Sequence, residues 1–255
     1  MFKAFRILVL LGILVTVAGT TLIARWQSQS WKRPQVVTLY PISAQGDAAT
    51  QGYLDRLDDA AFAGLSSYFQ AEAARYGLPL AEPVRVVLGR RVQVLPPAAP
   101  RDAGPIGAIS WSLRMRWWAW RQTPPSSPRP DVKLFLIYHP PDFEGAVPHS
   151  IGLEKGRLGL VHLFASRAQQ AQNEVVIAHE ALHTFGATDK YDPATLLPVY
   201  PAGYADPGQE PRYPQARAEL MGGRVPVRED EARIPASLRQ TVIGPETAAE
   251  IGWTK

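Results

Sequence analysis

Residues 179–189 of this chain read HEALHTFGATD, and this stretch says most about its fold. On a helix, side chains four residues apart lie on one face, so His179 and His183 can present their imidazoles to a single metal ion. Glu180 follows the first histidine and lies beside such a metal, where its carboxylate can take a proton from a bound water. The spacing therefore predicts a helix that carries a catalytic metal site.

Gly186 predicts where this helix ends, because glycine readily adopts the left-handed conformation of a helix C-cap. The chain then reverses, which can bring Asp189 back towards the histidines as a third ligand. Two histidines and one carboxylate leave a fourth position on zinc open for water, as in catalytic rather than structural zinc sites. We therefore expect one Zn²⁺ per chain, bound by His179, His183 and Asp189.

Other third ligands stay open at this point. Glu219 lies 36 residues after His183, and Asp192 follows closely behind Asp189, where it can instead bind calcium or cap a turn. An HExxH pattern also arises by chance on helices whose histidines are ordinary polar groups. Single histidines in strand or loop contexts are expected to be structural; these are His139, His149 and His162.

Length and composition bound the classes of protein that this chain can be. At 255 residues with 46% hydrophobic content, it can bury one large core or two modest ones. It has no cysteine, which excludes disulfides, thiolate zinc sites and thiol catalysis. The first 35 residues carry five of the 27 basic side chains and no acidic one, which leaves 22 basic against 23 acidic residues in the rest. A body so close to neutral predicts no nucleic-acid partner.

The N-terminal segment, residues 1–25, has the pattern of a signal anchor. Basic residues precede an apolar run from Ile7 to Ala24, and eighteen helical residues rise about 27 Å, enough to cross a hydrocarbon core. A cleaved signal would have a shorter apolar core and a clearer small-residue cleavage site. We therefore expect a single-pass anchor in the cytoplasmic membrane with the later residues on the extracytoplasmic side. If the segment is cleaved, the protein is exported to the same side.

The remaining chain divides into a linker, residues 26–50, and one domain, residues 51–255, with subdomains at 51–186 and 187–255. Apolar spacing predicts the following regular elements: a helix at 53–76, strands at 83–95 and 132–138, a hairpin of 151–153 with 158–164, and a short helix at 245–251. Residues 109–121 combine tryptophans with arginines, and we expect the tryptophans to fill the core while the arginines stay solvated. An interfacial membrane patch is the alternative reading of that segment.

The pattern HExxHxxGxxD at 179–189 resembles that of the metzincin zinc peptidases. Aspartate at the last position is similar to snapalysin, and the longer run from Asp189 to Asp192 is similar to peptidases of the immune-inhibitor-A type. Glu219-Leu220-Met221-Gly222-Gly223 resembles the Met-turn of this class, which implies that Met221 packs beneath the histidines without binding metal. The resemblance implies an α+β fold: a mixed twisted sheet, an active-site helix and an irregular C-terminal subdomain, preceded here by the transmembrane helix.

The resemblance further implies a zinc-dependent endopeptidase in which Glu180 is the general base. In this class a peptide or protein substrate adds as a strand to an exposed sheet edge, for which Leu160, Val161, His162 and Leu163 are the expected residues. A phenol can assist the reaction, and the candidates are Tyr191, Tyr200, Tyr204 and Tyr213. Two alternatives remain: a non-catalytic, metal-containing scaffold that binds peptides, and a zinc amidase that acts on a non-protein substrate.

Overall fold

The structure of the chain is a computed structural model that describes residues 30–254 apart from 99, 101–103, 145–147 and 154–155, together with Arg6, Leu11 and Gly12. The apolar run expected to cross the membrane, residues 7–24, lies outside this described part except for Leu11 and Gly12. Within the described part, no helix is both long enough and apolar enough to cross a membrane.

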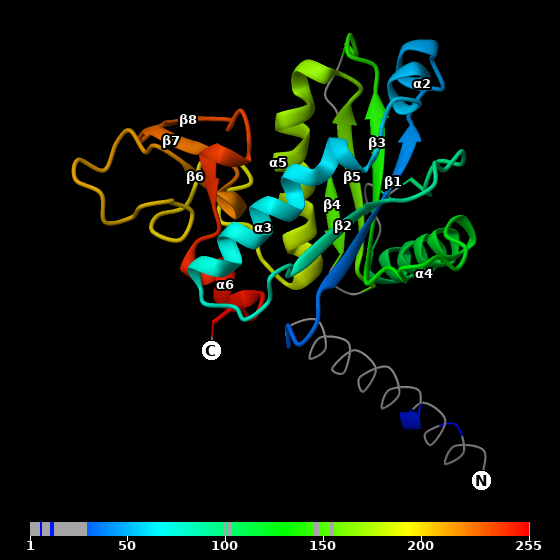
Figure 1. Cartoon of the computed structure of the whole chain (residues 1–255), viewed down its shortest axis with the longest axis horizontal. Coiled ribbons are helices and arrows are strands. Elements are labelled where there is room, and N and C mark those ends of the chain that lie inside the picture. The colour runs from blue at the N-terminus through cyan, green and yellow to red at the C-terminus, as the bar shows by residue number, and fades with distance from the viewer. Residues whose placement is uncertain are drawn as a thin grey trace.

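Five strands form one mixed, twisted sheet in the order β2-β1-β3-β5-β4 (Figure 1). Four of them run parallel, and β4, at one edge, runs antiparallel to β5. The strands are β1 Gln35–Ser43, β2 Val84–Leu88, β3 Val132–His139, β4 Ile151–Leu153 and β5 Leu158–Phe164. The expected strand at 132–138 and the expected hairpin are therefore confirmed, and the strand expected at 83–95 is shorter.

The expectation of a linker over residues 26–50 is wrong at β1, which is a central strand of the sheet. Pro41 lies within this strand, and proline is rare in central strands because it cannot donate to a neighbour. The structure accommodates it because pairing with β2 ends at Leu39 and Leu88, so the missing N–H falls beyond the end of that neighbour. On the other side, β1 pairs with β3 as far as Ser43.

Helices cover both faces of the sheet (Figure 1). On one face, α5 (Gln170–Phe185) and α3 (Ala63–Arg75) enclose the larger hydrophobic cluster, and on the other face α4 (Pro105–Gln122) encloses a smaller one. Two short elements, α2 (Ala48–Leu54) and the 3-10 helix η1 (Asp59–Phe62), connect β1 to α3. The helix expected at 53–76 is thus divided into these shorter pieces and α3.

The tryptophans of α4 are only partly in the core. Trp111 and Trp118 are buried against the sheet, as expected, with 9% and 6% of their surface exposed. Trp117 and Trp120 are exposed at 60% and 69%, so the expectation that the tryptophans of this segment fill the core is wrong for these two. A helix turns by about 100° per residue, and four tryptophans at these positions cannot share one face.

After α5 the chain is mostly irregular, as expected for the C-terminal part. Its elements are short: β6 Ala218–Glu219 paired with β9 Thr241–Val242, β7 Val225–Arg228 paired with β8 Glu231–Arg233, the 3-10 helices η3 Leu220–Gly222 and η4 Leu238–Gln240, and α6 Pro245–Glu250. The 3-10 helix η2 (Arg167–Gln169) precedes α5. This part packs along α5 and places η3 and η4 against it.

Candidate metal centre

The motif helix α5 forms because apolar residues recur along the face that meets the sheet, including Ile177, Ala181 and Phe185. Gly186 ends it in the left-handed conformation, with φ of 109°. The amide of Gly186 donates to the carbonyl of His183, and the amide of Ala187 donates to that of Leu182. These bonds close the last turn and reverse the chain, as the glycine predicted.

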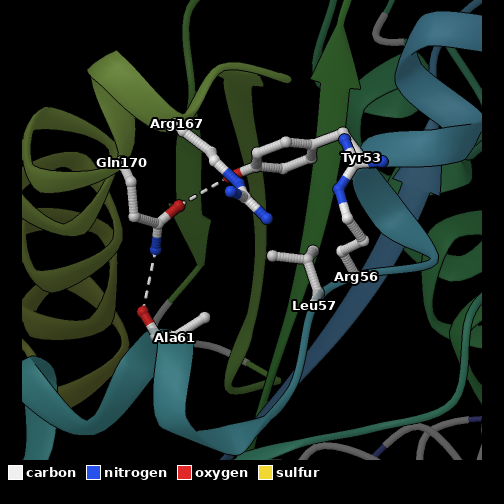
Figure 2. Close-up of a pocket in the computed structure, with 6 residues that line it drawn as sticks. All are labelled: Tyr53, Arg56, Leu57, Ala61, Arg167 and Gln170. Carbon is white, nitrogen blue, oxygen red and sulfur yellow. Dashed lines mark hydrogen bonds between the residues drawn. The ribbon is translucent and has the colours of Figure 1, made fainter.

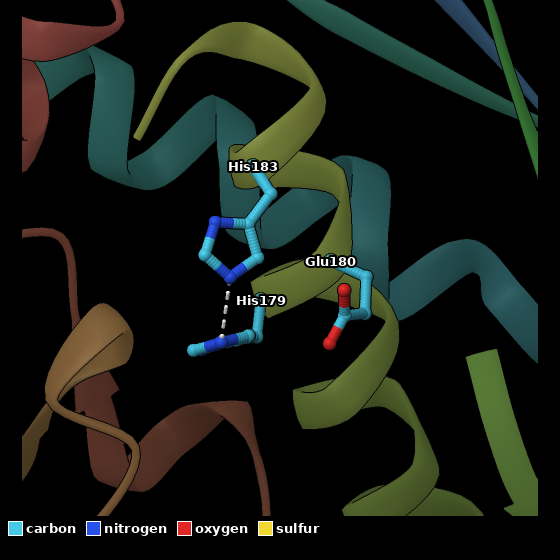
Figure 3. Close-up of side chains that lie close together, drawn as sticks. All are labelled: His179, Glu180 and His183. Carbon is cyan, nitrogen blue, oxygen red and sulfur yellow. Dashed lines mark hydrogen bonds between the residues drawn. The ribbon is translucent and has the colours of Figure 1, made fainter. Parts of the chain in front are cut away.

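The side chains of the two histidines of α5 point toward each other (Figure 3), with 3.2 Å between their Nε2 atoms. Nδ1 of His179 lies 2.9 Å from the carbonyl oxygen of Leu220, and Nδ1 of His183 lies 2.9 Å from that of Ala187. A carbonyl can only accept, so in each ring Nδ1 carries the proton and Nε2 presents a lone pair. Metal-binding histidines are held in the same way by such a partner on the second nitrogen.

Asp189 completes the cluster. Its Oδ1 lies 3.1 Å from Nε2 of His179 and 3.2 Å from Nε2 of His183. Burial alone would raise the pKa of Asp189, but the two histidines beside it outweigh burial and hold the pKa well below its usual value. For His179, burial would lower the pKa, yet Asp189 and Glu180 outweigh it and raise the pKa. The three groups thus form a site that favours positive charge at its centre.

Glu180 lies beside this cluster, with a carboxylate oxygen within 4.8 Å of the histidine nitrogens (Figure 3). Its side chain is buried, and its Oε2 has no hydrogen-bond partner among the described residues. Burial raises the pKa of Glu180, while the two histidines act in the opposite direction. A buried carboxylate oxygen without a partner is costly in an ordinary core and is more often found where chemistry uses it.

The donor set fits a divalent metal. Three acceptor atoms that lie within about 3.2 Å of one another repel unless a cation lies between them. Imidazole nitrogens with one carboxylate oxygen are the ligands of catalytic zinc sites. The side chain of Asp189 is 41% exposed while those of the histidines are at most 17% exposed, so the cluster opens to solvent on the aspartate side. Water and substrate can reach it there.

The edge strand β4 approaches α5 closely at Glu180 and His183, a contact that the sequence analysis did not predict. A Cβ atom on Gly152 would lie 2.5 Å from Cβ of His183 and 2.7 Å from the carbonyl oxygen of Glu180, so only glycine fits. The available signal was a glycine inside a short strand, which often marks a close backbone approach.

The strand expected to be the exposed edge is covered by a neighbouring strand over part of its length. β5, which contains Leu160, Val161, His162 and Leu163, lies between β3 and β4, and β4 covers it over Leu158–Leu160. The apolar pattern identified β5 as a strand and paired it with residues 151–153 in a hairpin, but it did not predict that β3 pairs with its other side. The open edge nearest the cluster is therefore the outer side of β4.

Met221 is fully buried in η3, beside the histidines. This turn contacts two segments that carry the candidate ligands. The carbonyl of Leu220 lies against Nδ1 of His179, and the carbonyl of Met221 accepts a hydrogen bond at 2.9 Å from the amide of Lys190, the residue after Asp189. Glu219, the alternative third ligand, is turned away into the core. Its carboxylate accepts hydrogen bonds from the amides of Gly222 and Gly244 and from the hydroxyl of Thr247.

Two further candidate residues, Asp192 and Tyr191, follow Asp189 in the chain. Asp192 accepts from the amides of Ala194 and Thr195 and so caps a turn, the second role that its position allowed. Tyr191 lies close to the site, with 6.4 Å between its ring centre and that of His179. Burial and then the charge of Asp189 raise the pKa of the Tyr191 phenol.

The remaining tyrosines and histidines bond elsewhere. The hydroxyls of Tyr204 and Tyr213 bond to each other at 2.8 Å, and the ring of Tyr200 lies beneath the guanidinium of Arg212. Nε2 of His139 lies 2.9 Å from Nδ1 of His162, and these two histidines form a pair of their own. His149 is exposed in the segment before β4.

A cavity of about 200 Å³ lies at the opposite end of α5 (Figure 2). The hydroxyl of Tyr53 donates to Gln170 at its wall, and Gln170 in turn donates to the carbonyl of Ala61. The cavity meets the first turn of α5, whereas the histidines lie in its last two turns. It is therefore separate from the metal cluster.

Comparison with known proteins gives a limited result. Neither a protein-family model nor a curated protein sequence matches the chain. Among solved structures, the chain is similar to the crystal structure of wild-type OgpA from Akkermansia muciniphila, with a TM-score of 0.44 and 15% sequence identity. The match covers 85% of this chain and 59% of that one, so this chain spans about three fifths of the length of OgpA.

Proposed function

We propose that this protein is a zinc-dependent endopeptidase. The observation that carries the proposal is the convergence of Nε2 of His179, Nε2 of His183 and Oδ1 of Asp189 within about 3.2 Å. Beside them lies a buried carboxylate oxygen of Glu180 that has no hydrogen-bond partner among the described residues. Zinc held by these three residues would lower the pKa of a water and polarise the carbonyl of the substrate.

In this proposal Glu180 moves the proton. Its buried Oε2 accepts a proton from the attacking water and then delivers it to the nitrogen of the leaving amine. Burial suits the carboxylate to this role, because it raises the pKa of Glu180 and so makes the group a stronger base than an exposed glutamate. A protein that only binds peptides would gain nothing from a buried carboxylate beside the metal ligands.

Tyr191 is the tyrosine that we propose assists the reaction. It follows Asp189 by two residues. Among the ring contacts of the described residues, it is the one of the four candidate tyrosines that pairs with a histidine of the cluster. Its raised pKa keeps the phenol protonated, so the hydroxyl can donate to the oxyanion that develops on the carbonyl of the substrate.

We propose that the substrate is an extended peptide that pairs with the outer side of β4. This strand is at the end of the sheet, and its backbone passes over Glu180 and His183 at Gly152. An added strand would pair with the backbone of that edge and would bring its own backbone past the metal cluster. Backbone pairing places a peptide bond there without the need for a particular side chain.

The location of the protein is also a proposal. The apolar run of residues 7–24 and the basic residues before it support an uncleaved anchor in the cytoplasmic membrane, with the proposed peptidase on the extracytoplasmic side. Fractionation of cells, followed by protease treatment of intact spheroplasts, would test this arrangement. A domain that is protected from added protease would place it on the cytoplasmic side and contradict the proposal.

The zinc content and the hydrolysis of an unstructured protein substrate test the function together. We expect one zinc per chain in the wild type, strongly weakened zinc binding in Asp189→Asn, and retained zinc in the matched control Asp192→Asn. Glu180→Gln should keep zinc but lose about a thousandfold in kcat. A wild type that folds and binds zinc, yet hydrolyses no more than Glu180→Gln, would replace the peptidase with a peptide-binding scaffold.

A further inference from the structure

Helix α4 has two apolar faces, and the fold uses only one of them. Trp111, Met115 and Trp118 pack against the sheet within the smaller hydrophobic cluster. On the outside, four large apolar side chains are each at least 60% exposed: Ile109, Leu113, Trp117 and Trp120. Contiguous apolar surface on the outside of a folded domain usually marks a binding site.

The exposed residues form one stripe rather than a scatter. At about 100° per residue, the stripe from Ile109 to Trp120 covers an arc of roughly 80° that is centred opposite the buried face. It runs along about 17 Å of the helix axis. Packing against the sheet cannot account for side chains that point in the opposite direction, so the stripe needs a second apolar environment.

Charge borders this stripe on both sides. α4 contains three arginines and no acidic residue, and the same helical geometry places Arg116 on one flank and Arg114 and Arg121 on the other. The guanidinium of Arg121 lies 5.2 Å from the ring centre of Trp117. A tryptophan-rich face bordered by cations is the composition of helices that lie in the headgroup region of a membrane.

We propose that this face of α4 docks on the surface of an anionic lipid bilayer. The charge complements anionic headgroups, and indole rings with one polar edge suit the boundary between headgroups and acyl chains. A single convex helix also buries its apolar stripe in a lipid surface without a matching groove.

The N-terminal sequence agrees with a position of the folded domain close to the membrane. The apolar run ends at Ala24, and β1 begins at Gln35, which leaves ten residues between them. An extended chain of that length spans at most about 35 Å. A domain anchored by this run would therefore lie against the bilayer. The proposal does not depend on the peptidase function, because α4 lies on the face of the sheet opposite α5 (Figure 1).

The absence of cysteine allows a direct test in the full chain. A fluorophore is attached at Ser110→Cys, which is exposed on α4 and spares the four apolar residues, or at Ile234→Cys after β8 as a matched control. Each protein is reconstituted in vesicles that contain nitroxide-labelled lipid, made of phosphatidylcholine alone or of phosphatidylcholine with phosphatidylglycerol. We expect quenching at position 110 to be several-fold stronger than at 234, and strongest with phosphatidylglycerol.

Two sets of substitutions separate docking from simple tethering, since the N-terminal segment is the same in every variant. Trp117→Ser with Trp120→Ser should reduce quenching at position 110 about twofold or more, whereas Ile234→Ser should not. Arg114→Gln with Arg121→Gln should reduce it only in the anionic vesicles. Thermal unfolding of each variant checks that α4 is still folded, and the arginine pair keeps the test valid if the tryptophan pair is unstable.

Three outcomes would overturn the proposal. Equal quenching at 110 and 234 would mean that the face does not contact lipid. A probe at 110 that transfers energy to a second labelled copy, without lipid quenching, would make the face a dimer interface. A probe at 110 that is already shielded from aqueous iodide before vesicles are added would mean that the chain covers this face with its own residues.

Discussion

The carbonyl oxygen of Leu220 lies 2.9 Å from Nδ1 of His179, although 41 residues separate them. This contact ties the turn around Met221 to the first histidine of the cluster and sets which ring nitrogen carries the proton. The cluster thus depends on a turn that belongs to neither the helix nor the sheet. The stability of that turn should control the geometry of the site.

The buried carboxylate of Glu219 is the main support of that turn, so Glu219→Gln should destabilise the protein. The amide group of glutamine offers a donor where the amide of Gly222 or Gly244 also donates, which leaves one buried donor unpaired. We expect a loss of about 1–3 kcal/mol in the free energy of unfolding, measured by urea denaturation. Zinc binding to the folded protein should persist, whereas its complete loss would indicate that Glu219 is a ligand.

Gly152→Ala should lower activity with little loss of zinc. The new Cβ would lie 2.5 Å from Cβ of His183, so β4 must move away from α5. We expect kcat/KM to fall about tenfold to a hundredfold because a peptide paired with β4 would no longer lie in register with Glu180. Gly208→Ala is the control, since its Cβ would meet Asp206 at an ordinary 3.7 Å. Equal activity of the two variants would contradict the role of β4 in substrate binding.

Tyr191→Phe should lower kcat and leave KM and zinc content nearly unchanged. The substitution keeps the ring beside His179 but removes the hydroxyl, so only an interaction made in the transition state is lost. We expect roughly a hundredfold loss in kcat, measured by steady-state hydrolysis of a peptide. Tyr200→Phe, whose ring lies under Arg212, serves as the control and should be unaffected. An unchanged kcat in Tyr191→Phe would remove the phenol from the mechanism.

The ion pair of Lys190 and Glu250 should stabilise the loop that carries Asp189, in a manner that depends on pH. The two groups are 2.7 Å apart, and Glu250 also accepts from the amide and hydroxyl of Thr188. Burial would raise the pKa of Glu250, but these partners outweigh it and lower the pKa below 4.5. A carboxyl with a lowered pKa stabilises the fold above its unfolded value and loses this contribution as the pH falls through the folded value.

Glu250→Gln should therefore cost roughly 1 kcal/mol in the free energy of unfolding near neutral pH, because the partly exposed pair is screened by solvent. The difference between the variant and the wild type should shrink as the pH is lowered below 4.5. Chemical denaturation at several pH values measures it. A difference that is constant across this range would show that the carboxylate charge is not the source of the effect.

Local sequence patterns predicted the parts of the site that lie close together in the chain. The spacing of His179 and His183 places both on one face of α5, and Gly186 ends the helix and returns Asp189 to the same place. Both follow from short-range geometry, a helix period and a left-handed cap, which tertiary contacts did not override.

The same local patterns gave wrong predictions where the structure depends on pairing between strands that are distant in the sequence. Residues 26–50 were expected to be a linker, yet β1 within them pairs in parallel with β2 on one side and β3 on the other. Pro41 is accepted there because the pairing with β2 ends at Leu39. β5 was expected to be an edge, but strand order depends on which segments meet across the sheet. On α4, helical spacing places the tryptophans on two opposite faces, and only the position of the sheet decided which face is buried.

The sequence by itself thus determined the motif helix, its end and the identity of three candidate ligands, because these depend on backbone geometry within about a dozen residues. Only the tertiary structure decided that Glu219 supports the turn rather than the metal, that β4 meets α5 at Gly152, and that the ring of Tyr191 lies beside His179. Those relationships depend on burial and on contacts between distant segments, and a local pattern carries no information about which distant segments meet.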